Sequence, residues 1–355
     1  MPEGHTVHRL SAAHQRMFRG HPVRASSPQG RFTAGAHRLD GQILTGAEAH
    51  GKHLLLGFGG LGSDGLGTDD LGSGGTAESG SDIEGSAESA ASRARQPGAR
   101  ITAPPAPGPR IGLGEPALVL HVHLGIYGAW SLGQGPAPAP TGAVRLRLTT
   151  APTMPYSAHD AHGAHVAPHP QDVWYADLRG PNACELLEPG DLKVLRDRLG
   201  PDPLRSDADP DRAYRRIARS RTPIATLLMD QSVVAGPGNI YRAEVLFRAG
   251  VPPLLAGRDV SPALWSRIWS DLVALMADGV RTGRIDTVRP QHMPEAMGRP
   301  PRVDDHGGEV YVYRRAGLPC LVCGTAVRTG PLAGRNLFWC PGCQPAPGRS
   351  LSSVR

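Results

Sequence analysis

The sequence has no run of about 18 apolar residues, the length that a helix needs to cross a membrane. It also lacks a positively charged start followed by an apolar run, so we expect neither a membrane span nor a signal peptide. We therefore expect a cytoplasmic protein. Aromatic residues make up only 5% of the chain, whereas glycine (46) and proline (35) are frequent. Part of the length is therefore expected to be loop rather than core.

Cysteine is also scarce, and its distribution is uneven. Of the five cysteines, four stand near the end as two pairs, Cys320-x2-Cys323 and Cys340-x2-Cys343. Two such pairs are typical of a tetrahedral zinc site with four thiolate ligands, which leaves no position open for a catalytic water. We therefore expect one structural Zn²⁺ ion rather than a disulfide framework, and we interpret Cys184 as a small core residue.

The net charge of +6 and the isoelectric point near 9.3 favour a polyanionic partner. Residues 58–114 are rich in Gly, Ser, Ala and Pro, and such a composition buries too little apolar area to fold, so we expect a disordered insertion there. A second loop insertion is expected over 152–172. Its four histidines have spacings that suit metal binding, but they lack a rigid frame; they are His159, His162, His165 and His169.

Hydrophobic periodicity predicts an amphipathic helix over 5–19, then short strands up to residue 57 and further strands at 117–124 and 144–148. Helices are predicted afterwards, over 191–199, 222–231, 240–247 and 262–281. Thr222 and Ser261 are the expected N-caps of two of them, because each precedes a proline at the first helical turn.

The first residues suggest an amine nucleophile. Removal of Met1, which the small Pro2 favours, leaves a free secondary amine beside the carboxylate of Glu3. A secondary amine that attacks an aldehyde-level carbon gives an iminium that is cationic without any added proton, and Glu3 can transfer protons at that carbon. Lys52 stands between a glycine and an apolar strand, where it can be held against a site. The alternatives are an ordinary solvated start and a surface lysine.

Three loops carry candidate contacts to a polyanion. An apolar residue between glycines, Ile126, suits a wedge that enters a base stack, although a plain hairpin has the same pattern. The glycine-rich turn 235–239 joins two helices, so its backbone N–H groups and Asn239 suit a phosphate, although a plain helical hairpin is the alternative. Between the cysteine pairs, residues 327–339 are expected to form a hairpin whose tip, Gly334-Arg335-Asn336, exposes an arginine.

Four motifs then occur in an order that indicates a family. They are Met-Pro-Glu-Gly at 1–4, Gly-Lys-His-Leu-Leu-Leu at 51–56, Asp-Gln-Ser-Val-Val-Ala-Gly-Pro-Gly-Asn-Ile-Tyr-Arg-Ala-Glu at 230–244, and Gly-Arg-Asn-Leu-Phe-Trp-Cys-Pro-Gly-Cys-Gln at 334–344. In these motifs the chain resembles the formamidopyrimidine-DNA glycosylase and endonuclease VIII family of bifunctional base-excision repair enzymes. It is most similar to the endonuclease VIII proteins of high-GC actinobacteria, over residues 1–57, 115–151 and 173–345.

The resemblance implies an α+β fold. We expect an N-terminal helix with an antiparallel β-sandwich over 1–178, a helix–two-turn–helix domain over 179–300, a zinc-ribbon hairpin over 310–345, and a disordered tail over 346–355. The activity it implies is that of a monomeric DNA glycosylase that is also a lyase at abasic sites. The expected partner is damaged DNA with oxidised bases, pyrimidines above all.

The resemblance also implies residue roles. Pro2 would attack C1′ of the damaged nucleotide, Glu3 would donate and accept protons at the sugar, Lys52 would donate a proton for β-elimination, and Arg335 would hold phosphates and assist δ-elimination. The implied DNA contacts are Gly125, Ile126, Tyr127, Arg198 and Asn239. Gly125 replaces a polar residue of the endonuclease VIII pattern, which leaves Ile126 and Tyr127 as the expected wedge.

Two other functions use some of the same residues. A non-catalytic protein that only binds damaged DNA would keep the basic charge, Asn239 and the cysteines, but it would not need Pro2, Glu3 and Lys52 together. A zinc hydrolase built on the histidines at 159–169 would lose its activity if that loop were deleted.

Overall fold

The computed structural model describes residues 2–59, 113, 116–150, 173–303 and 308–346. Most of the predicted insertion 58–114, the stretch 152–172 with its four histidines, and the tail from residue 347 lie outside the described residues. Phe58 and Gly59, which were predicted to begin the insertion, instead end a strand. Among the described residues, no helix is both long enough and apolar enough to cross a membrane.

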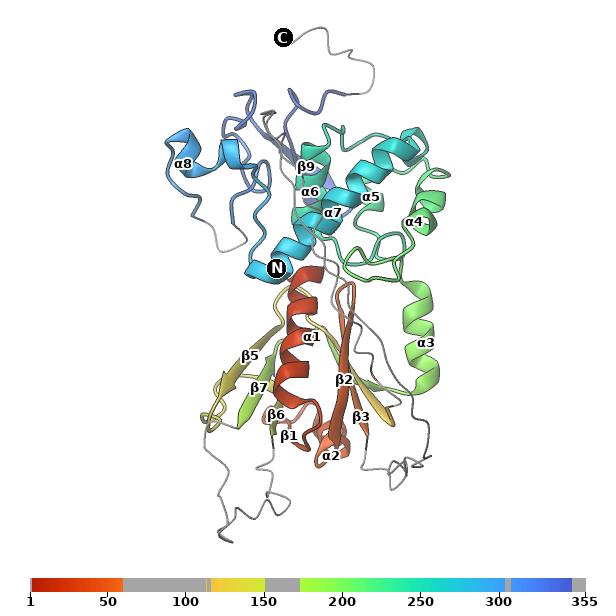
Figure 1. Cartoon of the computed structure of the whole chain (residues 1–355), viewed down its shortest axis with the longest axis vertical. Coiled ribbons are helices and arrows are strands. Elements are labelled where there is room, and N and C mark those ends of the chain that lie inside the picture. The colour runs from red at the N-terminus through yellow and green to blue at the C-terminus, as the bar shows by residue number, and fades with distance from the viewer. Residues whose placement is uncertain (1, 60–112, 114–115, 151–172, 304–307, 347–355) are drawn as a thin grey trace, which may run out of the picture. The chain divides into compact units, whose positions relative to one another are not determined.

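Two antiparallel four-stranded sheets form the first part of the fold, with strand orders β1-β6-β7-β5 and β2-β3-β4-β8 (Figure 1). The strands are β1 (Val23–Ser26), β2 (Ile43–His50), β3 (His53–Gly59), β4 (Leu118–His123), β5 (Ala129–Gln134), β6 (Val144–Thr150), β7 (Trp174–Arg179) and β8 (Ala183–Leu187). The predicted domain boundary at 178/179 falls inside this sandwich, because β8 pairs with β4.

Strand β3 is buried on both faces. Leu54 and Leu56 point into the core shared by the two sheets. Leu55 points the other way and packs against Leu192 and Leu195 of helix α3 (Pro189–Arg198). Burial on both faces explains the uninterrupted Leu-Leu-Leu run, and each buried leucine stabilises the fold by about 1.5–3 kcal/mol.

Helix α1 (Gly4–Phe18) confirms the amphipathic helix predicted over 5–19. Its apolar side, with Val7, Met17 and Phe18, belongs to the sandwich core. The Gln15 side-chain amide donates to the carbonyl of Ala47 at 2.8 Å, so α1 lies against β2, as Figure 1 shows.

His14, on the buried side of α1, is fully enclosed between Phe18 and Trp130. Its Nδ1–H donates to the Leu10 carbonyl at 2.8 Å, and within the described residues its Nε2 has no hydrogen-bond partner. Burial lowers the pKa of His14 to about 4, because the imidazolium would lose its hydration there. The side chain is therefore neutral in the folded protein at pH 7.

The low pKa of His14 makes the protein less stable in acid. Since the unfolded chain binds this proton near pH 6.5 and the folded chain only near pH 4, stability is lost as the pH falls through that window, by up to about 3 kcal/mol. We expect the His14→Leu variant to lose about that much less stability between pH 6.5 and 4, measured by urea unfolding at several pH values. His37→Gln, which changes an exposed histidine, is the control; equal losses in all three proteins would contradict the assignment.

Helices dominate the second part of the chain. They are α4 (Pro210–Ile217), α5 (Ile224–Leu227), α6 (Asn239–Arg248), α7 (Pro262–Thr282) and α8 (Pro294–Met297), with short 3₁₀ turns η2 (Gly257–Asp259) and η3 (Pro290–His292). Helix α6 is buried from Asn239 to Phe247 and lies at the centre of this part. The Ser261 cap of α7 is confirmed, because its hydroxyl accepts from the Leu264 N–H at 3.2 Å.

Some local predictions were wrong. Helix α5 has only one turn, its N-cap is Pro223, and the carbonyl of Thr222 accepts instead from Gly257 N–H at 3.0 Å. Beyond the end of α5, Asp230 accepts from both the N–H and the hydroxyl of Ser232, which favours a turn where the last helical residues were predicted. Helices α2 (Thr33–Leu39) and α4 were not predicted, although Asp209 caps α4 by accepting from Asp211 N–H at 2.9 Å.

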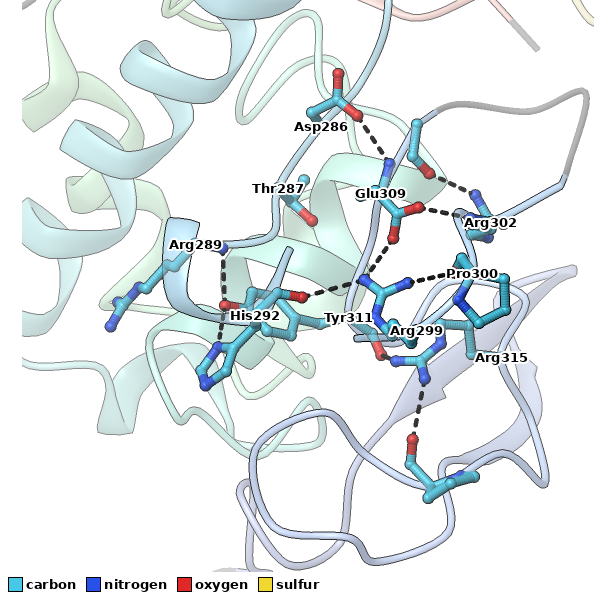
Figure 2. Close-up of polar contacts among 12 residues, drawn as sticks. Asp286, Thr287, Arg289, His292, Arg299, Pro300, Arg302, Glu309, Tyr311 and Arg315 are labelled. Atoms are coloured by element: carbon cyan, nitrogen blue, oxygen red, sulfur yellow. Dashed lines mark hydrogen bonds and ion pairs between the residues drawn. The ribbon is translucent and has the colours of Figure 1, made fainter. Parts of the chain in front are cut away.

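A polar network connects the exit of α7 to the segment before the zinc ribbon (Figure 2). The buried Glu309 carboxylate accepts from the Arg299 guanidinium and from the Arg302 N–H, both at 2.6 Å. The Tyr311 hydroxyl oxygen accepts a hydrogen bond from Arg289 N–H at 2.9 Å and is hydrogen-bonded to His292 Nδ1 at 2.9 Å. These contacts hold residues 289–302 against the start of the ribbon.

The ribbon itself is a hairpin of β9 (Arg328–Leu332) and β10 (Arg335–Trp339). Its tip is Ala333-Gly334, with φ values of 49° and 71°, which suit a two-residue hairpin turn. The tip was predicted at Gly334-Arg335-Asn336. Arg335 and Asn336 are instead the first two residues of β10, opposite Leu332 and Pro331.

Candidate active site

The amino terminus lies against the turn between α5 and α6. Gly4 N–H donates to the Gly236 carbonyl at 2.9 Å. A Cβ at Gly4 would stand 2.8 Å from Gly236 Cα, so the two backbones approach this closely only because residue 4 is glycine. Pro2, two residues before Gly4, is half-buried.

Glu3 is completely buried at the N-terminus of α6. Its carboxylate accepts from Gly238 N–H at 2.7 Å and from Ile240 N–H at 2.8 Å, two backbone donors that the helix itself leaves unpaired. Burial raises the pKa of the Glu3 carboxyl, although the charge of Lys52 and these backbone bonds oppose the shift. A carboxyl with a raised pKa suits general acid and base chemistry better than an ordinary surface glutamate does.

Lys52 reaches the same turn from the β2–β3 hairpin. Its Nζ donates to the Pro237 carbonyl at 2.8 Å. Burial lowers the pKa of this ammonium, with Glu3 opposing the shift and Arg335 adding to it. Of the two sequence interpretations, the structure thus favours a lysine held against a site over a surface lysine.

Two residues that the sequence analysis did not single out shape this meeting point. The buried Asp202 carboxylate accepts from Gly51 N–H at 2.7 Å and from His8 Nε2 at 2.8 Å, so it fixes the hairpin of Lys52 against α1. Gln231 donates to the Pro237 carbonyl at 3.1 Å and accepts from Gly236 N–H at 2.9 Å. The only sequence signal for Asp202 is its position between Pro201 and Pro203, a pattern typical of the end of a helix.

The zinc hairpin contacts the start of α6. Asn239 Nδ2 donates to the carbonyl of Asn336 at 2.9 Å, and the fully buried Arg242 guanidinium donates to the same carbonyl at 3.3 Å and to Asn239 Oδ1. Arg335, which directly precedes Asn336, lies near enough to lower the pKa of both Lys52 and Arg242. The Asn239 amide, expected to contact DNA, is thus 6% exposed and holds β10 in place.

The loop 124–128 presents apolar side chains to solvent. Gly128 N–H donates to the Leu124 carbonyl at 2.9 Å, and Gly125 has a φ of 68°, which closes a tight turn. Ile126 is 49% exposed and Tyr127 is 87% exposed. Large apolar side chains at such exposure on a turn are what a wedge between bases requires.

Arg198, at the end of α3, is exposed. Its charge contributes to the lowered pKa of His53, His121 and His123 on the neighbouring strands, so it lies close to all three. The remaining cysteine, Cys184, packs against the sandwich core, and burial raises the pKa of its thiol to about 12.

The four clustered cysteines fit a zinc ion. Their sulfurs all lie within 4.8 Å of one another, with Cys320 and Cys343 Sγ 3.8 Å apart and Cys323 and Cys340 Sγ 3.4 Å apart. Sulfurs bound tetrahedrally at about 2.3 Å to one ion would stand about 3.8 Å from each other. The donor set and its spacing therefore suit structural zinc.

Family models match two regions of the chain. The formamidopyrimidine-DNA glycosylase H2TH domain matches residues 199–290, and the zinc finger found in FPG and IleRS matches residues 317–346. Endonuclease 8 1 of Mycobacterium tuberculosis is 40% identical over 351 residues, which cover 97% of this chain and all of that protein. A formamidopyrimidine-DNA glycosylase of Parasynechococcus marenigrum is 38% identical over 41% of this chain and 51% of its own length.

Solved structures show the same fold. The MutM (Fpg) protein of Thermus thermophilus has a TM-score of 0.59 at 22% identity, covering 97% of this chain and 98% of its own. The Lactococcus lactis Fpg in complex with DNA that contains an abasic site has a TM-score of 0.59 at 17% identity, covering 97% of this chain and all of its own.

Proposed function

Because the chain belongs to the formamidopyrimidine-DNA glycosylase and endonuclease VIII family of DNA repair glycosylases, we propose that it removes oxidised bases, pyrimidines above all, and then cleaves the strand at the abasic site. One observation carries this proposal. The amino terminus, the Lys52 hairpin and the start of α6 meet at the 235–238 turn, with Glu3 buried between them. All of these groups come from one chain, so the proposed site is complete without a second copy, and we propose that the enzyme acts as a monomer.

The proposed reaction begins at Pro2. Its nitrogen forms a bond to C1′ while the bond from C1′ to the base breaks, and the base leaves with a proton. Once the proline nitrogen has lost its own proton, the bond from C1′ to the ring oxygen O4′ breaks while Glu3 gives that oxygen a proton, for which its raised pKa is suited, so the ring opens and C1′ becomes an iminium. The resulting iminium withdraws electrons from C2′, so loss of a C2′ proton breaks the bond to the 3′ oxygen. A second elimination breaks the bond to the 5′ oxygen and leaves a gap with a phosphate at each end.

Access to C1′ requires the nucleotide to leave the duplex, which costs a few kcal/mol. We propose that Ile126 and Tyr127 fill the space it leaves, and that Lys52, Arg198 and Arg335 hold the flanking phosphates. Cys320, Cys323, Cys340 and Cys343 hold the zinc ion, which fixes the hairpin that carries Arg335. Asn239 acts by holding that hairpin as well as by any contact to DNA that its remaining N–H makes.

A panel of duplexes tests the proposed function. Each contains one oxidised pyrimidine, one oxidised purine or one abasic site, and borohydride is added to trap any iminium. We expect excision and a trapped adduct, most strongly with the pyrimidine lesions. A protein that only binds damaged DNA would shift these duplexes on a gel, release no base and give no adduct.

The role of Arg335 has its own test. Hydrogen bonds between charged groups, such as arginine and phosphate, contribute more free energy than neutral ones. We therefore expect Arg335→Ala to lower strand cleavage about 10- to 100-fold while zinc content stays at one ion per chain. Arg328→Ala changes an exposed arginine at the other end of the same hairpin and should leave cleavage unchanged. Cleavage rates and metal analysis distinguish the outcomes: loss of zinc from the Arg335 variant would show that the arginine only maintains the fold.

A further inference from the structure

A hydrogen-bonded network runs across the outer face of the β3-β4-β8 sheet, beyond the apolar contacts with α3. Glu185 Oε1 lies 2.9 Å from His121 Nδ1, and His121 Nε2 lies 2.8 Å from His53 Nδ1. These three residues, the histidine network, come from three adjacent strands, with His121 opposite Glu185 in the register. The reaction proposed above uses none of them.

The bonding pattern determines which nitrogens carry protons. The Glu185 carboxylate only accepts, so His121 carries its proton on Nδ1. Burial lowers the pKa of His121, whose ring is therefore neutral, and its Nε2 accepts from the Nδ1–H of His53. His53 is neutral too, with a pKa lowered by burial to about 3, so its Nε2 is unprotonated.

The network ends at the proposed DNA-binding residues. His53 directly follows Lys52 and stands opposite His123 in the sheet, and the centroids of the two histidine rings are 4.9 Å apart. His123 is half-buried, and within the described residues its buried Nδ1 has no hydrogen-bond partner, so its proton is favoured on Nε2. The charges of Lys52 and Arg198 both lower the pKa of His123. We call Lys52, His123 and Arg198 the phosphate corner.

We propose that Glu185 and His121 are positioning residues, which fix the ring of His53 against His123 and so hold the phosphate corner in the geometry that receives a DNA phosphate. A neutral ring is required at this place. A protonated His53 would repel both Lys52 and Arg198, and a freely rotating one would let the His123 ring turn away. The proposal rests on the proposed function, because it assigns these residues to binding of the same substrate.

Glu185 suits mutation because its side chain is 57% exposed on an edge strand, where leucine is tolerated. We expect Glu185→Leu to raise Kd about 10-fold for a duplex with tetrahydrofuran, an abasic-site analogue that is not cleaved. Its single-turnover rate at saturating abasic DNA should stay within twofold of the wild type. Glu185→Gln should bind almost as the wild type does, because the amide oxygen still accepts from His121 Nδ1–H. Glu188→Gln, at an exposed glutamate of the same region, is the matched control.

A purely structural role would lower the melting temperature of the leucine variant without moving Kd at 25 °C. Unchanged Kd, or equal losses in the leucine and glutamine variants, would overturn the proposal. Long-range ¹H–¹⁵N spectra of the wild-type histidines give a second test that needs no variant. They should show His121 and His53 each protonated on Nδ1, and a proton on His53 Nε2 would contradict the network. If the wild type binds the analogue but forms no adduct with abasic DNA, the proposed function fails while the Kd comparison still stands.

Discussion

The Pro2→Gly variant should give no trapped protein–DNA adduct when it is mixed with abasic DNA and borohydride. The secondary amine of Pro2 forms an iminium that is cationic at every pH, whereas the amine of glycine forms an imine that needs an added proton before it withdraws electrons. Loss of a nucleophile is among the most costly changes in an enzyme, so strand cleavage should fall by about three orders of magnitude or more. Gel separation of the trapped adduct and single-turnover cleavage rates measure both effects.

The variant keeps Glu3 and Gly4, whose contacts with residues 236–240 hold the terminus, so binding of the uncleaved tetrahydrofuran duplex should remain near that of the wild type. A wild-type protein that retains Met1 should fail in the same way, because its proline nitrogen is then an amide. Full trapping by either form would refute the role of Pro2.

Glu3→Gln is expected to slow base excision much more than it slows formation of the adduct between Pro2 and abasic DNA. The carboxamide cannot give or take the proton at the sugar, so excision of an oxidised base should slow about 10²- to 10⁴-fold. Abasic DNA already presents an aldehyde carbon, and no base has to leave, so Pro2 should still form a trapped adduct with it. Single-turnover excision and borohydride trapping, measured side by side, give the comparison.

The pH dependence of base excision gives a further test of the role of Glu3. Because burial raises the pKa of Glu3, the protonated carboxyl persists to a higher pH than an ordinary glutamate allows. Because the protonated carboxyl of Glu3 donates at the sugar, wild-type excision should decline as the pH rises through that pKa, and the residual rate of the variant should be flat. Excision at the wild-type rate by Glu3→Gln, with zinc content and melting temperature preserved, would exclude this role.

Local signals predicted the elements that depend on neighbouring residues. The two cysteine pairs, the periodic face of α1 and the Ser261 cap of α7 each depend on residues that are close together in the sequence, and the structure confirms them. The fold class was predicted as well, through the order of motifs. Thr222 shows where local signals fail: its position before Pro223 resembles a cap, but its carbonyl is taken by Gly257, a partner 35 residues away.

The site depends on contacts that no local pattern contains. Glu3 accepts from Gly238, and Asp202 accepts from Gly51, across 235 and 151 residues of sequence. Sequence motifs pointed to the Pro2-Glu3 start and to Lys52 as two separate features, and the structure adds that Glu3 and Lys52 contact the same turn. The structure also shows a contact of Asn239 that nothing in the sequence indicated, because its side-chain amide donates to the carbonyl of Asn336.

The most direct test is to find which atom of the chain joins the sugar. Wild-type protein trapped on abasic DNA is digested with nuclease and trypsin, and mass spectrometry locates the remaining sugar fragment. We predict an N-terminal peptide that lacks Met1 and carries the fragment on the nitrogen of Pro2. A fragment on Lys52, or normal cleavage by a protein whose Met1 is still in place, would contradict the account.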